Sequence, residues 1–256
     1  MDSQKNLFAL LLCVVLGGCG GSSTPAAPPA APPVVVTPPD PALGGIWAGV
    51  MTIDASLGSE ECAALVTEDG RFRFFCAFNP MQLVGMQSNS SGAVIGSGLA
   101  ISSLVFLDGT TVTNLSMEGT LLERDSFIGS WTTDSPGDSG SFEFFYDTEY
   151  ERASSLALVE GVWSGYDDLG NPNSSFTIDN LGQFTGQNSF GCTSNGSFSI
   201  IDARYNLYQV DSTISGCEIA GQYSGLAAMG DIDNPSDAIV LVTDNGIRAI
   251  LLGLQK

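Results

Sequence analysis

The sequence predicts an all-β protein: two tandem antiparallel up-and-down β-barrels, or flattened sandwiches, of about eight strands each, after a disordered Pro-rich tether. Beyond residue 44 the chain is rich in Gly, Ser, Thr, Asn, Phe, Val and Ile and poor in Lys and Arg, which favours β structure over helix. Two-residue turn signals recur at short intervals between segments in which apolar and polar residues alternate. Several short motifs then recur in the same order in the second half of the chain, as expected after a duplication.

Residues 1–18 have the features of a signal peptide. The apolar run at 7–16 is shorter than the about 20 residues that a membrane-spanning helix needs, and it has the length of a signal-peptide core. It is followed by Gly17-Gly18-Cys19, and with Leu16 this motif resembles the lipobox of bacterial lipoproteins. An ordinary secretory signal with an incidental cysteine is the alternative.

The lipoprotein resemblance implies that Cys19 becomes the N-terminus and carries a thioether-linked diacylglycerol and an N-acyl chain. Stable attachment needs more than one acyl chain, so this modification would make the lipid bilayer the first partner of the protein. In such lipoproteins an Asp after the Cys favours the inner membrane. Gly20 stands there in this chain, which implies the outer membrane, at its periplasmic face or at the cell surface.

Residues 19–44 are expected to form a lipidated Pro/Ala-rich tether without fixed structure. Most of the 12 prolines of the chain lie here, and the segment has few large apolar residues to bury. Pro-rich chains favour extended polyproline II at about 3.1 Å per residue, so the tether could hold the folded part on the order of 60–80 Å from the lipid. A ligand for a Pro-reading domain is the alternative.

The first predicted β repeat spans 45–147 and the second spans 160–256. Strands that alternate in polarity, as in residues 71–78, are joined by Asx-Gly pairs that are typical of tight hairpin turns. These pairs are Asp69-Gly70, Asp108-Gly109, Asn195-Gly196 and Asn245-Gly246.

Three motifs and a loop support the duplication. The matched segments are 45–49 with 161–165, 66–72 with 178–184, and 126–131 with 218–223. Each copy then enters an acidic, Pro-containing loop, at Asp134–Asp138 in the first and Asp231–Pro235 in the second. Between the copies, 148–159 is expected to form a short helical linker capped by Thr148 and Glu151. Chance similarity between two strand-rich halves is the alternative.

Each copy opens on Gly-x-Trp, at Trp47 and at Trp163, which resembles the opening of lipocalin-type barrels. This resemblance implies that the tryptophan closes the floor of the barrel and has a packing role. The chain also resembles envelope lipoproteins with paired β domains. An eight-stranded barrel is either just filled by its side chains or holds one small ligand.

Cys13 lies in the apolar core of the signal peptide and would be removed with it. Four cysteines remain once Cys13 and the lipidated Cys19 are set aside, two in each copy: Cys62, Cys76, Cys192 and Cys217. In an oxidising envelope an even number of cysteines predicts disulfides. The first two flank the turn at Asp69-Gly70 and the other two lie at the ends of neighbouring predicted hairpins, so we expect Cys62–Cys76 and Cys192–Cys217 bridges. Zinc binding is the alternative, but the chain has no Cys-x-x-Cys spacing and no histidine.

The absent residue types argue against an enzyme, and we expect no catalytic residue and no cofactor. Histidine is absent, and lysine occurs only at Lys5 and Lys256. Gly137-Asp138-Ser139-Gly140 resembles the nucleophile motif of trypsin-like proteases, but that serine needs a histidine base. A pair of carboxylates, as glycoside hydrolases use, stays open, because acidic residues are many and no spacing singles out a pair.

The formal net charge is −20, from 28 acidic and 8 basic residues. Such a surface repels nucleic acid and favours basic partners or cations. The segment after Gly230 has oxygen ligands at alternate positions, as calcium loops do, but lacks the glycine and the distal glutamate of an EF-hand. Asp231, Asp233 and Asp237 are therefore weak calcium candidates, and we expect a solvated hairpin loop and no metal.

These features predict a membrane-anchored envelope lipoprotein that acts as a non-catalytic binding or interaction module. Its target is an unknown protein or a small ligand inside a barrel. The alternative is a hydrolase, for example one directed at glycans, that works with carboxylates alone. Exposed aromatic side chains beside a cleft would favour the first class, and two close, buried carboxylates with raised pKa values would favour the second.

Overall fold

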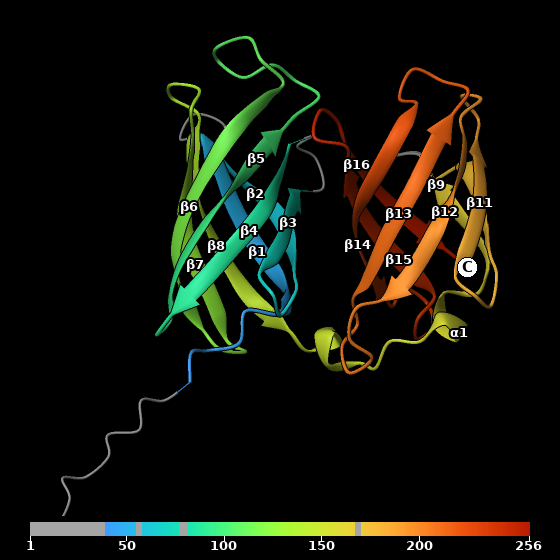
Figure 1. Ribbon diagram of the computed structural model, residues 1–256, viewed down its shortest axis with the longest axis horizontal. Coiled ribbons are helices and arrows are strands. Elements are labelled where there is room, and N and C mark those ends of the chain that lie inside the picture. The colour runs from blue at the N-terminus through green and yellow to red at the C-terminus, as the bar shows by residue number, and fades with distance from the viewer. Residues whose placement is uncertain (1–38, 55–57, 77–80, 167–169) are drawn as a thin grey trace, which may run out of the picture. The chain divides into compact units, whose positions relative to one another are not determined.

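Sixteen strands form two closed antiparallel barrels in the ranges that the computed structural model describes, residues 39–54, 58–76, 81–166 and 170–256 (Figure 1). The first barrel consists of β1 (Gly45–Asp54), β2 (Gly58–Val66), β3 (Arg71–Cys76), β4 (Gln82–Ser90), β5 (Ala93–Ile101), β6 (Val112–Leu122), β7 (Ser126–Thr133) and β8 (Ser139–Asp147). The second consists of β9 (Gly161–Tyr166), β10 (Pro172–Ile178), β11 (Gln183–Asn188), β12 (Thr193–Ile200), β13 (Tyr208–Ser215), β14 (Gly221–Gly230), β15 (Ala238–Asp244) and β16 (Ala249–Gln255). Each strand pairs with the next along the chain, so the predicted tandem up-and-down barrels are confirmed and the flattened sandwich is excluded.

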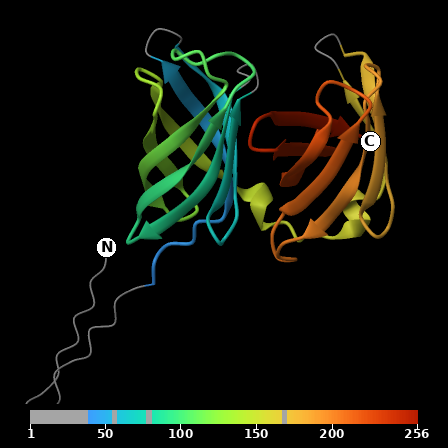
Figure 2. The same cartoon turned by 45° about the horizontal axis from the view of Figure 1, so that its top comes forward.

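Each barrel closes where its last strand meets its first, and Figure 2 shows both barrels from a second direction. β8 pairs with β1 at seven positions, from Ile46↔Asp147 to Thr52↔Ser141. In the second barrel, the described residues of β16 and β9 pair at two positions, Leu254↔Gly165 and Gln255↔Ser164. The closing ladder of the second barrel is therefore the shorter one.

Two ends of each barrel can be told apart by the course of the chain. We call the end at which β1 or β9 begins the closed end, and the opposite end the mouth. The segment before β1 contacts the β4–β5 turn at the closed end, where Asn89 Nδ2 donates to the carbonyl of Pro41 at 2.6 Å and the N–H of Ser91 donates to the Asp40 carboxylate at 2.7 Å. Residues 1–38 lie outside the described ranges, so the signal peptide, Cys19 and most of the tether stay predictions.

Large aromatic side chains fill the first barrel. Phe74, Phe127 and Phe142 are buried, and their rings meet edge to face, with centroids 4.8 Å apart for Phe127 and Phe142 and 5.3 Å apart for Phe74 and Phe142. Trp47 is fully buried, and its ring centroid lies 5.9 Å from that of Phe127. Such aromatic pairs contribute about 0.5–1.5 kcal/mol each beyond the area that they bury.

In the second barrel the corresponding tryptophan also lies in the core. Trp163 is fully buried, and its Nε1–H donates to the carbonyl of Val159 at 2.7 Å. Val159 belongs to the short helix α1 (Leu156–Val159) and is itself part of the apolar core of this barrel. The packing role expected for Trp47 and Trp163 is confirmed.

A third apolar cluster joins the two barrels. Ile46 and Leu65 of the first barrel belong to the same cluster as Leu226 and Val242 of the second. Beside it Arg73 pairs with Asp244 at 2.9 Å, and only 17% and 13% of these side chains are exposed. Burial lowers the pKa of the Arg73 guanidinium, and the Asp244 carboxylate opposes this shift. Residues 39–256 accordingly form one compact unit.

One predicted hairpin turn is wrong. Asp69-Gly70, Asp108-Gly109 and Asn245-Gly246 lie between strands, as expected, but Asn195-Gly196 lies inside β12. A Cβ atom at Gly196 would come 2.1 Å from the backbone oxygen of Asp211 on β13 and 2.7 Å from the Phe184 ring. The glycine therefore lets an aromatic ring pack against the backbone of a strand and does not turn the chain.

The third motif of the predicted duplication does not match strand for strand. Residues 45–49 and 161–165 both lie in first strands, but 126–131 opens β7, the seventh strand, whereas 218–223 leads into β14, the sixth strand of its barrel. The acidic loops are therefore not equivalent. Asp134–Asp138 connects β7 to β8 at the mouth of the first barrel, and the loop from Asp231 connects β14 to β15 at the closed end of the second.

The linker contains a 3-10 turn, η1 (Thr148–Glu151), followed by α1. The predicted cap is wrong by one residue, because Asp147 is the N-cap and its carboxylate accepts the N–H of Glu149 at 2.9 Å. Asp147 ends β8 with an extended backbone, which places its side chain over the free N–H groups of the turn.

Candidate functional site

Small side chains on the inner face leave space in the mouth half of the second barrel. Because residues on one face of a strand alternate, Gly186 faces inward with the buried Phe184, and Ser194 and Gly196 face inward with the buried Phe198. The strand register places these small residues next to one another, with Gly186 opposite Ser194 and Gly196 opposite Ser212. The second barrel thus has glycine and serine where large side chains would be needed to fill it.

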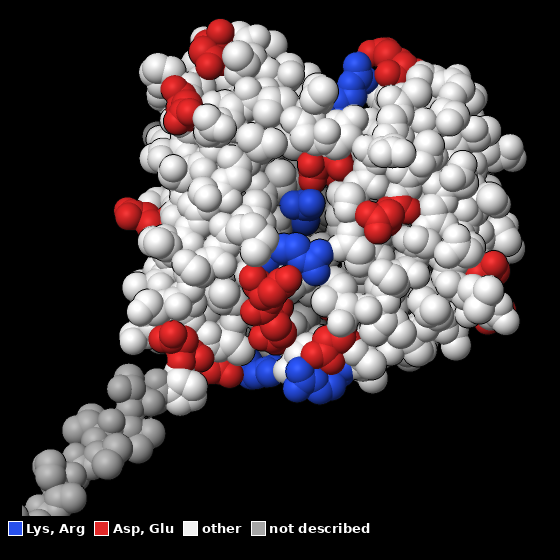
Figure 3. Space-filling model, in the orientation of Figure 1, with Lys and Arg blue, Asp and Glu red and all other residues white. Residues whose placement is uncertain are grey.

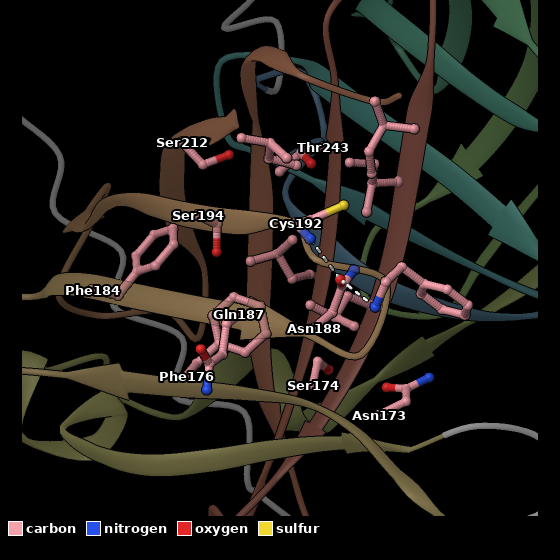
Figure 4. Close-up of a pocket in the computed structure, with 16 residues that line it drawn as sticks. Asn173, Ser174, Phe176, Phe184, Gln187, Asn188, Cys192, Ser194, Ser212 and Thr243 are labelled. Atoms are coloured by element: carbon pink, nitrogen blue, oxygen red, sulfur yellow. Dashed lines mark hydrogen bonds between the residues drawn. The ribbon is translucent and has the colours of Figure 1, made fainter. Parts of the chain in front are cut away.

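The space is a cavity of about 170 Å³ that opens at the mouth (Figure 4). Its apolar wall is made by aromatic and aliphatic side chains from β10, β11, β13, β15, β16 and the β13–β14 loop: Phe176, Phe184, Ile214, Ile219, Leu241, Ile250 and Leu252. Its polar groups come from side chains that are neutral: Asn173, Ser174, Gln187, Asn188, Ser194, Ser212 and Thr243. No Asp, Glu, Lys or Arg is among the described residues that line it.

The rim of this cavity is tied together by a disulfide. Cys192 lines the cavity and is bonded to Cys217, which lies just after β13. Within the β11–β12 turn, the Asn188 side-chain oxygen accepts the N–H groups of Phe190 and Cys192, both at 3.0 Å. Phe190 lies at the entrance with 80% of its surface exposed. The entrance is therefore built before any ligand arrives.

Both predicted disulfides are present. Cys62 and Cys76 lie directly opposite each other on β2 and β3, with their Cα atoms 4.0 Å apart. They flank the Asp69-Gly70 turn, as the spacing in the sequence predicts. This bridge is buried in the wall of the first barrel, whereas Cys192–Cys217 lies at the rim of the second.

Two of the three calcium candidates, Asp231 and Asp237, have their carboxylates engaged by protein groups. The Asp237 carboxylate accepts the N–H groups of Ile232, Asp233 and Asn234 at 2.6–3.0 Å, and these bonds lower its pKa. The Asp231 carboxylate pairs with Arg152 at 2.7 Å, which lowers its pKa as well. Within the described ranges no three acidic, Cys or His side chains gather in a way that could hold a metal ion.

The protease-like motif is part of a loop. The Asp138 carboxylate accepts the Ser135 hydroxyl at 2.5 Å and the N–H of Leu107 at 3.0 Å, and Ser139 is the first residue of β8. These contacts tie the β7–β8 loop to the β5–β6 loop. They give Asp138 a structural role.

The arginine side chains of the described residues form ion pairs. Figure 3 shows the few Lys and Arg side chains of one face lying beside acidic ones. Arg152 pairs with Asp231 at 2.7 Å and Arg204 with Asp202 at 2.6 Å. Each of the six described arginines has a carboxylate partner: Arg71, Arg73, Arg124, Arg152, Arg204 and Arg248.

No family model and no curated protein matches this sequence. Among solved structures, the chain is similar to a candidate outer membrane protein of Bacteroides fragilis at 11% sequence identity, with 84% of this chain and 97% of that chain covered and a TM-score of 0.30. A likeness this distant supports no statement about function. In the described part of the chain, the helices are too short or too polar to cross a bilayer.

Proposed function

We propose that this chain is a lipid-anchored, non-catalytic binding module of the bacterial envelope, and that it holds a small ligand in the mouth of its second barrel. The observation that carries the proposal is the cavity with its prebuilt rim. A mostly apolar pocket with a few polar groups that point into it is the usual form of a small-molecule site. The exposed Phe190 beside the opening also favours binding over catalysis.

The lipid anchor is part of the proposal. The lipobox-like motif that ends at Cys19 and the Pro-rich segment up to residue 44 support it. With Cys19→Ser, we expect no incorporation of a radioactive fatty acid and release of the protein into the soluble fraction. Continued labelling of that variant would refute the anchor without touching the cavity.

The carboxylate-only hydrolase is the weaker candidate. Among the carboxyl groups that the structure describes, Glu149 has a raised pKa, which burial causes and which the neighbouring Arg152 opposes. Glu149 pairs with Arg152 at 3.0 Å in the linker, and it is not among the residues that line the cavity. A glycosidase needs an acid with a raised pKa and a second carboxylate on opposite sides of one substrate bond, and the described residues that line the cavity include neither.

The binding proposal can be tested with N-phenylnaphthylamine, a neutral apolar dye that fluoresces when it leaves water. We expect the full chain to bind the dye, with the phenyl ring in the cavity and the naphthyl group packed against the exposed Phe190 at the rim, which shields it from water. Ser194→Phe places a ring in the cavity and should weaken binding at least about tenfold, since it removes most of the buried contact. Ser199→Phe on the exposed face of the same strand is the matched control and should bind as the unchanged chain does. Equal binding by the two variants would refute the site.

A further inference from the structure

The size of the cavity limits what it can hold. Its volume of about 170 Å³ is close to that of an engineered cavity of about 150 Å³ that takes benzene. Pockets for drug-sized molecules are larger, about 300–1,000 Å³. A single six-membered ring therefore fits, whereas a long acyl chain or a fused ring system would have to leave most of its length outside.

The walls suit a flat ring. The ring centroids of Phe176 and Phe184 lie 6.1 Å apart and the ring planes are inclined by 59°. Leu241, Leu252 and Ile250 of β15 and β16 supply an aliphatic wall. Aromatic rings prefer edge-to-face contacts at centroid distances of about 4.5–7 Å, so a third ring can join the two phenylalanines in this way.

Serine hydroxyls in the cavity wall are free for a polar substituent. Ser194 and Ser212 line the cavity from β12 and β13, and their side chains make no hydrogen bond within the described part of the chain (Figure 4). The buried Oγ of Ser174 also has no partner there. Each can donate one hydrogen bond and accept two. A ligand hydroxyl or amide would therefore find both kinds of partner there.

The described residues that line the cavity offer no charge that could compensate an ion. Moving a carboxylate or an ammonium group into an apolar site is costly when no opposite charge or metal compensates it. None of the described lining residues is charged, and the chain carries 28 acidic residues that repel anions at longer range. A neutral molecule meets neither obstacle.

From these properties, and on the basis of the proposed function, we infer that the second barrel binds a neutral single-ring molecule that carries a hydroxyl or amide group. The ring lies among Phe176, Phe184 and the aliphatic wall, and its polar group meets Ser194 and Ser212. Benzyl alcohol has this chemistry. Benzoate is its charged counterpart, and toluene is the same ring without a polar group.

Displacement of N-phenylnaphthylamine from the full chain tests the inference. Benzyl alcohol should displace the dye. The same displacement by benzoate should require a concentration at least about tenfold higher, since one uncompensated charge costs more than a factor of ten in affinity. The double variant Ser194→Ala with Ser212→Ala should bind benzyl alcohol about five- to tenfold more weakly, and its affinity for toluene should be unchanged. NMR shifts of the methyl groups of Ile214, Ile250 and Leu252 should report the same site.

Each result has one meaning. Equal displacement by benzoate and benzyl alcohol on the unchanged chain, which needs no variant to fold, would overturn the neutral class. If the serine variant lost affinity for toluene and for benzyl alcohol equally, the proposed contact of the serines with the polar group would be wrong. Binding of the dye without displacement by either neutral ring would overturn the ligand class and leave the proposed function standing, whereas no binding of the dye would remove the proposed function itself.

Discussion

Gly196 is a residue at which a local sequence signal predicts the wrong backbone structure. Asn-Gly is a strong hairpin signal, and three other Asx-Gly pairs of this chain do lie between strands. At Gly196 the Phe184 ring occupies the place of a side chain, so packing across two strands overrides the local preference. No dipeptide rule contains that information, because Phe184 lies on the neighbouring strand.

The same glycine gives a prediction about stability. Gly196→Ala would push a methyl group into the Phe184 ring and the backbone of β13, so we expect a loss of about 1–3 kcal/mol in the free energy of unfolding. Gly253→Ala is the matched control, because a Cβ there meets no atom within 4 Å, and it should change stability by less than about 0.5 kcal/mol. Urea titration followed by tryptophan fluorescence measures both. Equal stability of the two variants would contradict the packing role of Gly196.

At the scale of the element, strand number, topology and both disulfides could be predicted from the sequence because each depends on local signals. Alternating polarity marks the strands. Cys62 and Cys76 flank one predicted turn and must meet when that hairpin closes, and Cys192 and Cys217 lie at the ends of neighbouring predicted hairpins. The cavity could not be predicted in the same way. Its signal is the set of small residues at Gly186, Ser194, Gly196 and Ser212, and these become one inner surface only when the register of three strands is known.

The rim disulfide should matter for binding as well as for stability. The double variant Cys192→Ser with Cys217→Ser should lower the free energy of unfolding by about 3 kcal/mol. It should also bind N-phenylnaphthylamine more weakly, because the loops that carry Phe190 and Ile219 are no longer joined. Cys62→Ser with Cys76→Ser should cost a similar amount of stability and leave dye affinity unchanged. Calorimetry and dye titration distinguish these effects. The same dye affinity in both variants would show that the rim does not depend on its disulfide.

At the scale of the whole molecule, the described chain is two barrels with a shared apolar cluster. Each barrel has its own core, yet Leu226 and Val242 of the second are buried in the cluster that also holds Ile46 and Leu65 of the first. Repeats in the sequence indicate two copies, but they give no information on how far the copies depend on each other. The two barrels depend on each other through residues on their outer faces. An alternating strand pattern predicts that such residues are exposed to solvent.

The stability of isolated segments of the second barrel shows how far it depends on the first. We expect residues 154–256 to unfold in one cooperative transition, because β9 to β16 close a complete barrel over a core of their own. Residues 160–256 should be less stable by about 1–3 kcal/mol, because that cut removes buried Val159 and the acceptor of the Trp163 Nε1–H. Differential scanning calorimetry compares the two. The absence of a cooperative transition in the longer segment would mean that the barrels share one folding unit.

The hydrogen bonds of Asp40 and Pro41 to the β4–β5 turn have a consequence for access to the protein. They bring the chain in at the closed end of the first barrel, and the linker after β8 then leads to the closed end of the second, so both connections are made on the side away from the cavity. Residues 39–44 and the linker therefore leave the entrance at Phe190 uncovered. A molecule that diffuses through the surrounding water meets neither of these connections on its way into the cavity.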